Sequence, residues 1–322
     1  MSELLRTDDL ESIFGSGRGE IVDLSDATRM LSDVFDRNAS ALPHPDVVLL
    51  SGGIDSILVA VAAVRRGVSP LCVTATTSLD DPNLDGLVAQ QVTEFLGLEW
   101  MPVLITPREI RDLVTRSMDR LGGAGLYAVG AMVVDLAISD ALASRHKKVA
   151  WTGGWADILF GPFPSTVDPD GPPRFDSGGR RELIRRACSS DDVNKYAGCP
   201  SPLHDIGMDV VQFFETEQCV AAAGRLSPSV LTFSGPDGPV TKAPLRLLGE
   251  SWGLPRTFTT QPKRALQDSS GAFSLMAESA REDESLLCDD FTVHTPRRHG
   301  RDAAIMTAYW LQRMASSSPV MD

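Results

Sequence analysis

The sequence predicts an α/β fold, a doubly wound parallel sheet followed by a mainly helical C-terminal part. Three observations support this prediction. Short apolar, β-branched runs alternate with segments of helical periodicity over residues 46–161, as is typical of parallel sheets. Two of these runs end in a Gly-Gly turn that leads into a helix, at 52–53 and 153–154. A Pro/Gly-rich stretch at 162–181 then separates this core from residues 182–312, and residues 313–322 are expected to form a flexible tail.

The predicted elements follow in order. Residues 1–45 hold a weakly ordered start and then a helix over about 25–40, which opens on the capping residues Ser25 and Asp26. The next expected helix runs to about residue 66, and the one over 84–96 should end at Gly97. Strands are expected over residues 47–50, 70–75, 100–104 and 148–151. Two further helices are expected over residues 107–121 and 126–144.

The turn after the first strand carries the strongest functional signal. It contains Ser51, Gly52, Gly53, Asp55 and Ser56. Backbone N–H groups and the helix dipole converge at such a turn, and the missing glycine side chains let a phosphate approach. A carboxylate fits beside phosphate if Mg²⁺ lies between them. The turn therefore indicates a site for the pyrophosphate of ATP; the alternative is a plain connection, and the usual Gly-Lys-Ser/Thr ending of a P-loop is absent.

The turn after the fourth strand repeats this chemistry. Thr152, Gly153 and Gly154 end the strand, and Asp157 follows. We expect Asp157 to share a magnesium ion with Asp55. The alternative is that Asp157 is an early helix residue favoured by the helix dipole.

Composition narrows the class of protein. The chain has 322 residues, 43% of them hydrophobic, and a net charge of −13, which is typical of a soluble globular protein and disfavours a nucleic-acid partner. Five scattered cysteines without a Cys-x-x-Cys pair indicate reduced thiols in the cytoplasm. No run approaches the roughly 18 apolar residues of a membrane span, and the acidic N-terminus does not resemble a signal peptide. A homo-oligomer is compatible with this composition.

With these motifs in view, the chain resembles the synthetase domain of the asparagine synthetase family, within the PP-loop or N-type ATP pyrophosphatase superfamily. The family's second motif reads Ser/Thr-Gly-Glu/Gln-Gly-Ser/Ala-Asp-Glu-Leu-Phe-Gly. It is matched here by Thr152, Gly153, Ala156, Asp157, Leu159, Phe160 and Gly161. A further series matches at Lys242, Leu245-Arg246, Gly253-Leu254-Pro255, Pro262-Lys263 and Ser270-Gly271, so that the resemblance covers about residues 28–280.

This resemblance implies cleavage of ATP between its α and β phosphates, with ATP and Mg²⁺ as cofactors. It implies catalytic roles for Lys263, over the α-phosphate, and for Asp209, the acid kept in the acceptor region. The adenine is expected against Leu49-Leu50 and the second strand. The implied ATP contacts are Leu50, Ser51, Gly52, Gly53, Asp55, Ser56, Val73, Thr74, Ala75, Thr152 and Gly153, and the implied metal ligands are Asp55 and Asp157.

Several positions depart from the family pattern. The chain begins Met1-Ser2, without the N-terminal cysteine of a glutaminase domain, so free ammonia, an amine or a separate glutaminase subunit is expected to supply nitrogen. Gly154 replaces an acidic or amide residue, Trp155 replaces glycine and Ile158 replaces a carboxylate. A group that assists attack on the adenylate is therefore missing, and asparagine is not the expected product.

The preferred hypothesis is an ATP-dependent ligase that adenylates a small-molecule carboxylate and transfers the acyl group to ammonia or an amine. One alternative is an enzyme that adenylates a nucleobase or transfers sulfur, for which the basic surfaces and paired cysteines are lacking. The other is a nucleotide-binding partner protein with reduced catalysis, suggested by the losses at positions 154 and 158.

Overall fold

Five parallel strands form the central sheet. The computed structural model describes residues 19–123, 125–161, 184, 199–235, 238–261, 265–282 and 310. The strand order is β3-β2-β1-β4-β5, which confirms the predicted doubly wound parallel sheet. The strands are β1 (Val47–Leu49), β2 (Leu71–Thr76), β3 (Trp100–Leu104), β4 (Val149–Thr152) and β5 (Asp209–Gln212). The last of these was not predicted, and it brings the C-terminal part of the chain into the sheet.

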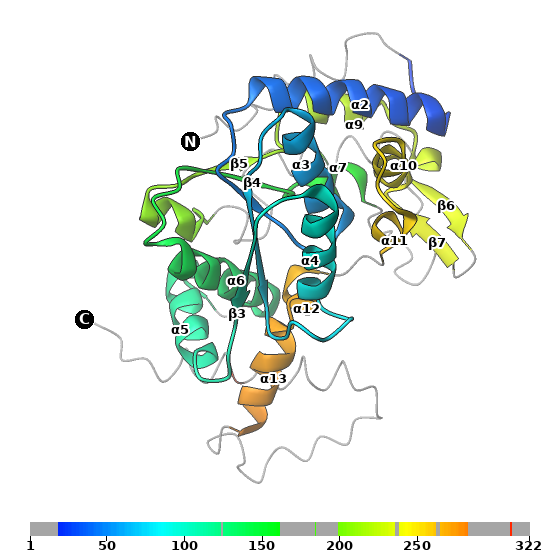
Figure 1. Cartoon of the computed structure of the whole chain (residues 1–322). Coiled ribbons are helices and arrows are strands. Elements are labelled where there is room, and N and C mark those ends of the chain that lie inside the picture. Colours follow the sequence, from blue (N-terminus) through cyan, green and yellow to red (C-terminus); the bar gives the residue numbers. More distant parts are fainter. Residues whose placement is uncertain are drawn as a thin grey trace.

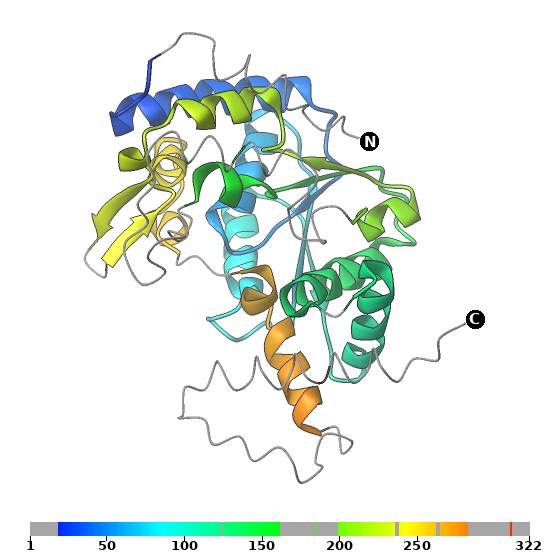
Figure 2. The ribbon, with the colours of Figure 1, turned by 180° about the vertical axis from the view of Figure 1, so that it is seen from behind.

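Helices cover both faces of this sheet (Figures 1 and 2). One face packs against α2 (Leu24–Ala41), α3 (Ile54–Arg65), α4 (Asp85–Leu96), α7 (Ala156–Phe160), α9 (Glu217–Arg225) and α10 (Ala243–Ser251). The other packs against α5 (Ile110–Leu121), α6 (Leu126–Leu142) and α13 (Ala272–Glu282). Shorter elements are η1 (Pro202–Ile206), η2 (Pro228–Val230), β6 (Thr232–Gly235), β7 (Gly238–Thr241), α11 (Arg256–Thr259) and α12 (Leu266–Ser269).

Local sequence accounts for several of these boundaries. The Asp23 carboxylate caps α2 by accepting from the N–H of Asp26 at 2.9 Å, as a good N-cap residue does. Gly97 ends α4 in the left-handed conformation, with φ of 66°, as the sequence predicts. All of β2 is buried, because helices cover both faces of a doubly wound sheet.

The strand order places the two glycine-rich turns together. From β1 the chain proceeds outward to β2 and β3, then returns through α5 and α6 to β4 on the other side of β1. Leu49 and Thr152, the last residues of β1 and β4, are register partners. Ligands of open α/β sheets bind where the strand order reverses in this way, beyond the carboxyl ends of the strands.

An aromatic cluster holds the end of β5 against the N-terminal helix. The Phe35 ring of α2 makes edge contacts with Phe213 and Phe214, at centroid distances of 5.5 and 5.3 Å. The Asn38 side-chain amide donates to the carbonyl of Phe213 at 2.6 Å. Rings packed edge to face resist sliding, so this cluster fixes the position of the residues that follow β5.

Some predictions concern residues that the structure does not describe. The predictions for residues 1–18 and for the stretch 162–181 lie outside the described residues. The predicted domain limits stay predictions. Within the described ranges Cys72, Cys199 and Cys219 are free thiols. In the same ranges no single helix has the length and apolar composition to cross a membrane; α5 and α6 meet that criterion only as a pair, bent by 114°.

Gly153→Ala tests how closely the two turns pack. A Cβ at Gly153 would lie 2.8 Å from the Ser56 nitrogen and 3.0 Å from the Asp55 carbonyl carbon, and backbone atoms cannot easily move away. We expect the free energy of unfolding to fall by about 1–3 kcal/mol, measured by urea denaturation. Gly19→Ala is the control, because a Cβ there meets nothing within 4 Å; equal stabilities of the two variants would contradict the packing.

Candidate active site

The first turn is bonded mostly to itself. The Ser56 hydroxyl accepts from the Ser51 N–H at 2.9 Å and lies 2.9 Å from the Ser51 hydroxyl. The Ser51 hydroxyl in turn accepts from the N–H of Gly53 at 3.2 Å. Gly53 is the N-cap of α3 and has no side chain to bond the first-turn N–H groups. The turn is therefore preformed, and the N-terminus of α3 can receive an anion.

Gly52 has a second, structural role. Its N–H donates at 2.9 Å to Asp85, a carboxylate that is only 6% exposed. A Cβ at Gly52 would lie 2.9 Å from that carboxylate oxygen. The other Asp85 oxygen accepts from the Ser269 hydroxyl at 2.7 Å. The buried Asp85 thus connects the turn after β1 to the C-terminal part of the chain.

The second turn lies directly on the first. Gly153 passes so close to Asp55 and Ser56 that only a glycine fits there. Trp155 adopts a left-handed conformation with φ of 71°, which costs a non-glycine residue about 1–2 kcal/mol. The backbone at Trp155 therefore has the left-handed conformation that a glycine, the family's residue at this position, would adopt easily.

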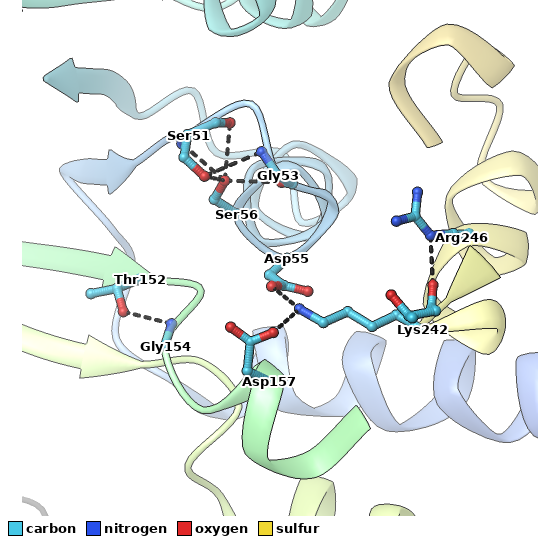
Figure 3. Close-up of polar contacts among 10 residues, drawn as sticks. Ser51, Gly53, Asp55, Ser56, Thr152, Gly154, Asp157, Lys242 and Arg246 are labelled. Atoms are coloured by element: carbon cyan, nitrogen blue, oxygen red, sulfur yellow. Dashed lines mark hydrogen bonds and ion pairs between the residues drawn. The ribbon is translucent and has the colours of Figure 1, made fainter. Parts of the chain in front are cut away.

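The two expected metal ligands meet at a buried lysine. Asp55 of α3, Asp157 of α7 and Lys242, which precedes α10, point toward one another (Figure 3). The Lys242 ammonium bonds the Asp55 carboxylate and lies 2.5 Å from that of Asp157. The Lys242 side chain is 1% exposed, whereas the Asp157 carboxylate is 50% exposed. We call these three residues the charged triad.

The charge state of Lys242 follows from its neighbours. Burial alone lowers the pKa of its ammonium, but the charges of Asp55 and Asp157 outweigh burial and raise the pKa above its ordinary value. Lys242 therefore stays protonated. A positive charge is thus built into the site beside two carboxylates.

Arg246 supports the turn that presents Lys242. Lys242 itself is in the left-handed conformation, with φ of 57°. The Arg246 guanidinium donates to the Thr241 carbonyl at 2.7 Å and also to the Thr259 carbonyl. Burial lowers the pKa of Arg246, and the negative charge of Asp55 opposes that shift. Arg246 therefore ties Lys242 to the rest of the C-terminal part.

The charged triad fits the expected magnesium ion. Asp55 and Asp157 converge on one cationic atom, so their oxygens lie close enough to share a cation. Mg²⁺ is commonly held by one or two carboxylates together with substrate phosphates. No cluster of three His, Cys, Asp or Glu side chains that could hold a metal ion occurs in the described part of the chain.

The structure brings some predicted residues to this site and not others. The side chains of Leu50, Val73, Thr74 and Ala75 are buried in the sheet beside the first turn, and their contact with adenine stays a prediction. Lys263 lies outside the described residues.

The expected position of Asp209 needs correction. Asp209 begins β5 opposite Val149, whereas Gln212 ends it opposite Thr152. Because β5 runs parallel to β4, its first residue lies at the amino edge of the sheet, away from both turns. The structure therefore does not bring Asp209 to the site.

Three residues at the site were missed as functional candidates. Lys242 had appeared only as part of a family match, and its ion pair with Asp55 joins positions 187 residues apart. Asp85 carries no local signal, since an acidic residue opening a helix is common. Gln212 is a polar residue in an otherwise apolar run, Val210 to Phe214, which was a usable sign.

Comparisons with known proteins agree with the motifs. Residues 44–202 match the family model described as asparagine synthase, and no curated protein matches the chain significantly. Among solved structures, NMN synthetase from Francisella tularensis is similar with a TM-score of 0.41 and 15% identity, over 90% of this chain and 94% of that one. The ammonia-dependent NAD synthetase from Campylobacter jejuni gives a TM-score of 0.36 and 15% identity, over 92% and 96%. At these TM-scores the likeness carries no argument about substrate or reaction.

Lys242→Met tests the charged triad. It leaves two carboxylates without their cation, and we expect the free energy of unfolding at pH 7 to fall by about 2 kcal/mol, less than for a fully buried pair because Asp157 is half-exposed. The folded pKa is raised above 10.5, so the contribution is fully present at pH 7 and is lost only as the pH rises beyond that value.

Urea denaturation of the wild type, Lys242→Met and the control Lys148→Met, at an exposed lysine, measures this effect. Adding MgCl2 should recover part of the loss in Lys242→Met, because a divalent cation can neutralise the same carboxylates. Equal stability of Lys242→Met and wild type would contradict the buried ion pairs.

Proposed function

Residues 44–202 match the asparagine synthase family, within the ATP-using PP-loop superfamily, and from this premise we propose that the protein is an AMP-forming amide ligase. It would activate a small-molecule carboxylate by adenylation and transfer the acyl group to ammonia or an amine. One observation carries this proposal: carboxylates from both glycine-rich turns converge on a single cationic centre at the reversal point of the sheet.

This arrangement suits a triphosphate. The N-terminus of α3, preceded by the preformed turn Ser51–Gly53, offers N–H groups to the β and γ phosphates. Asp55 and Asp157 would hold Mg²⁺, which when bound neutralises phosphate charge. Lys242 lies close enough to both carboxylates to add a fixed positive charge beside the departing pyrophosphate, where preorganised charge lowers the barrier most.

The proposed reaction has two steps. A substrate carboxylate oxygen attacks the α-phosphorus, the bond to the bridging oxygen breaks and pyrophosphate leaves with that oxygen. Ammonia or an amine then attacks the acyl carbon, AMP leaves with the bonding electrons and the nitrogen loses a proton. Since AMP is a good leaving group, the second step depends mainly on positioning the two reactants.

Lys263 keeps its proposed place over the α-phosphate, on the strength of the resemblance at 262–271. The nearby Ser270 and Gly271 support this indirectly. The Ser270 carbonyl accepts from the N–H of Thr77, just beyond β2, at 2.8 Å. The segment that follows Lys263 thus lies at the carboxyl edge of the sheet, where ATP is proposed to bind.

The test is pyrophosphate release from MgATP over a panel of carboxylic acids, with and without ammonium chloride. We expect release that depends on one acid, with AMP formed in equal amount. Asp157→Asn should lower the rate about 100-fold, because it removes one of the two converging charges at a side chain that is 50% exposed.

Asp112→Asn is the matched control, since it also changes an exposed helical aspartate, 70% exposed and paired with Arg116; its rate should equal that of the wild type. Release of inorganic phosphate and ADP in place of pyrophosphate would contradict the proposal. Acid-independent adenylation of a nucleobase would favour the alternative enzyme class. Tight ATP binding without any cleavage would favour a nucleotide-binding partner protein.

A further inference from the structure

Gln212 fills the space of a missing side chain in the second turn. A Cβ built on Gly154 would lie 2.0 Å from the Gln212 Oε1 atom and 3.0 Å from its Cδ atom. Gly154 stands where related motifs carry an acidic or amide residue. The structure therefore supplies a carboxamide at this point after all, from the neighbouring strand β5.

The backbone holds this carboxamide in register with the site. Gln212 pairs with Thr152 across β4 and β5, and the next N–H, of Phe213, donates to the Thr152 carbonyl at 3.1 Å. Asn38 holds the Phe213 carbonyl from the far side. Gln212 thus lies at the carboxyl edge of the sheet, on the opposite side of β4 from the first turn.

Hydrogen bonds also fix which way the amide faces. The Gly154 N–H donates to the Thr152 hydroxyl at 3.0 Å, and that hydroxyl donates to Gln212 Oε1 at 2.6 Å. The amide oxygen is therefore engaged. Within the described ranges the Gln212 amide nitrogen donates no hydrogen bond, and the side chain is half-exposed.

We infer that Gln212 binds the acyl substrate, its amide nitrogen donating to the carboxylate oxygen that does not attack ATP, with Thr152 as the positioning residue. This inference rests on the proposed function and names a specificity-determining residue for it. An amide NH₂ group only donates hydrogen bonds, so its ligand must be an acceptor; the lone pair of an attacking amine nitrogen is used in forming the new bond and cannot accept at the same time.

The same donor would act through both steps. It would hold the carboxylate while the other oxygen approaches the α-phosphorus. It would then face the carbonyl oxygen of the acyl adenylate, where negative charge develops as the amine attacks.

The variant Gln212→Glu distinguishes substrate binding by the amide nitrogen from a purely structural role of the side chain. A glutamate keeps an oxygen that accepts from Thr152 but loses the NH₂ donor, so the urea midpoint should stay at the wild-type value. Binding of acetate, benzoate, glycine, L-aspartate, L-glutamate and citrate is measured by saturation-transfer NMR, with Mg²⁺ and α,β-methylene-ATP present. We expect the wild type to bind at least one acid and Gln212→Glu to bind it about 10- to 100-fold more weakly, with unchanged affinity for the nucleotide.

Two further variants report on the same contact. Gly154→Ala should displace the end of the Gln212 side chain, crowd the Thr152 hydroxyl, which lies 3.2 Å from the added Cβ, and weaken acid binding with little loss of stability. Gly154→Gln combined with Gln212→Val returns the carboxamide to position 154 and should recover acid binding. Gln91→Glu, at an exposed position of α4, is the control and should bind as the wild type does.

Binding of none of these acids by the wild type, or equal binding by Gln212→Glu, would overturn the inference. The ligase proposal is tested by a different measurement, pyrophosphate release. If no acid supports pyrophosphate release but acid binding depends on Gln212, the acid-binding role of Gln212 is supported and the ligase proposal is rejected. If release occurs with the same KM for the acid in Gln212→Glu, the ligase stands and the inference falls.

Discussion

The close approach of two backbone turns is the constraint on which the site depends. β1 and β4 are parallel neighbours, and Gly153 passes against Ser56 with no room for a Cβ. This contact brings Asp55 and Asp157 to one place, where two carboxylates would repel each other. A cation is needed there, and Lys242 supplies it from the start of α10. In this structure the cation at the junction of the two turns therefore comes from the C-terminal part of the chain.

That contribution is connected to the core at several points. Lys242 reaches Asp55 and Asp157, Ser269 reaches the Asp85 carboxylate, and Ser270 accepts from Thr77. Since Asp85 also accepts from the N–H of Gly52, the turn proposed to bind phosphate is bonded to the segment that follows Lys263. Buried ion pairs add little net stability over apolar packing, but they are costly when one partner is missing. These connections accordingly make the two parts of the chain dependent on each other.

Local sequence was sufficient to predict the strand–helix alternation, the cap at Gly97 and the two glycine-rich turns, because each depends on near neighbours. It did not predict β5, a four-residue strand with no glycine turn to mark its end. The wrong prediction for Asp209 has the same cause. Asp209 and Gln212 are the two ends of β5, and only the direction of that strand shows which end faces the site. Lys242 and Asp85 were missed because their partners lie far away in the chain, and pairings of that kind are decided by tertiary packing. The roles assigned to the ATP contacts and metal ligands stay predictions, and for Asp55 and Asp157 the structure adds that they converge.

The strand order also puts the two turns proposed to bind the nucleotide and the residue proposed to bind the acyl group on different strands. The central pair β1 and β4 is enclosed by neighbours on both sides, so changes there disturb the packing of the whole sheet. β5 is an edge strand, paired on one side only in the described part of the chain, and Gln212 lies at its end. If Gln212 binds the acyl group as inferred above, substitutions at this edge would alter acyl recognition while the two turns proposed to bind the nucleotide stay unchanged. Phe213 and Phe214, which follow β5, are buried against α2, so such substitutions would be confined to the end of β5 itself.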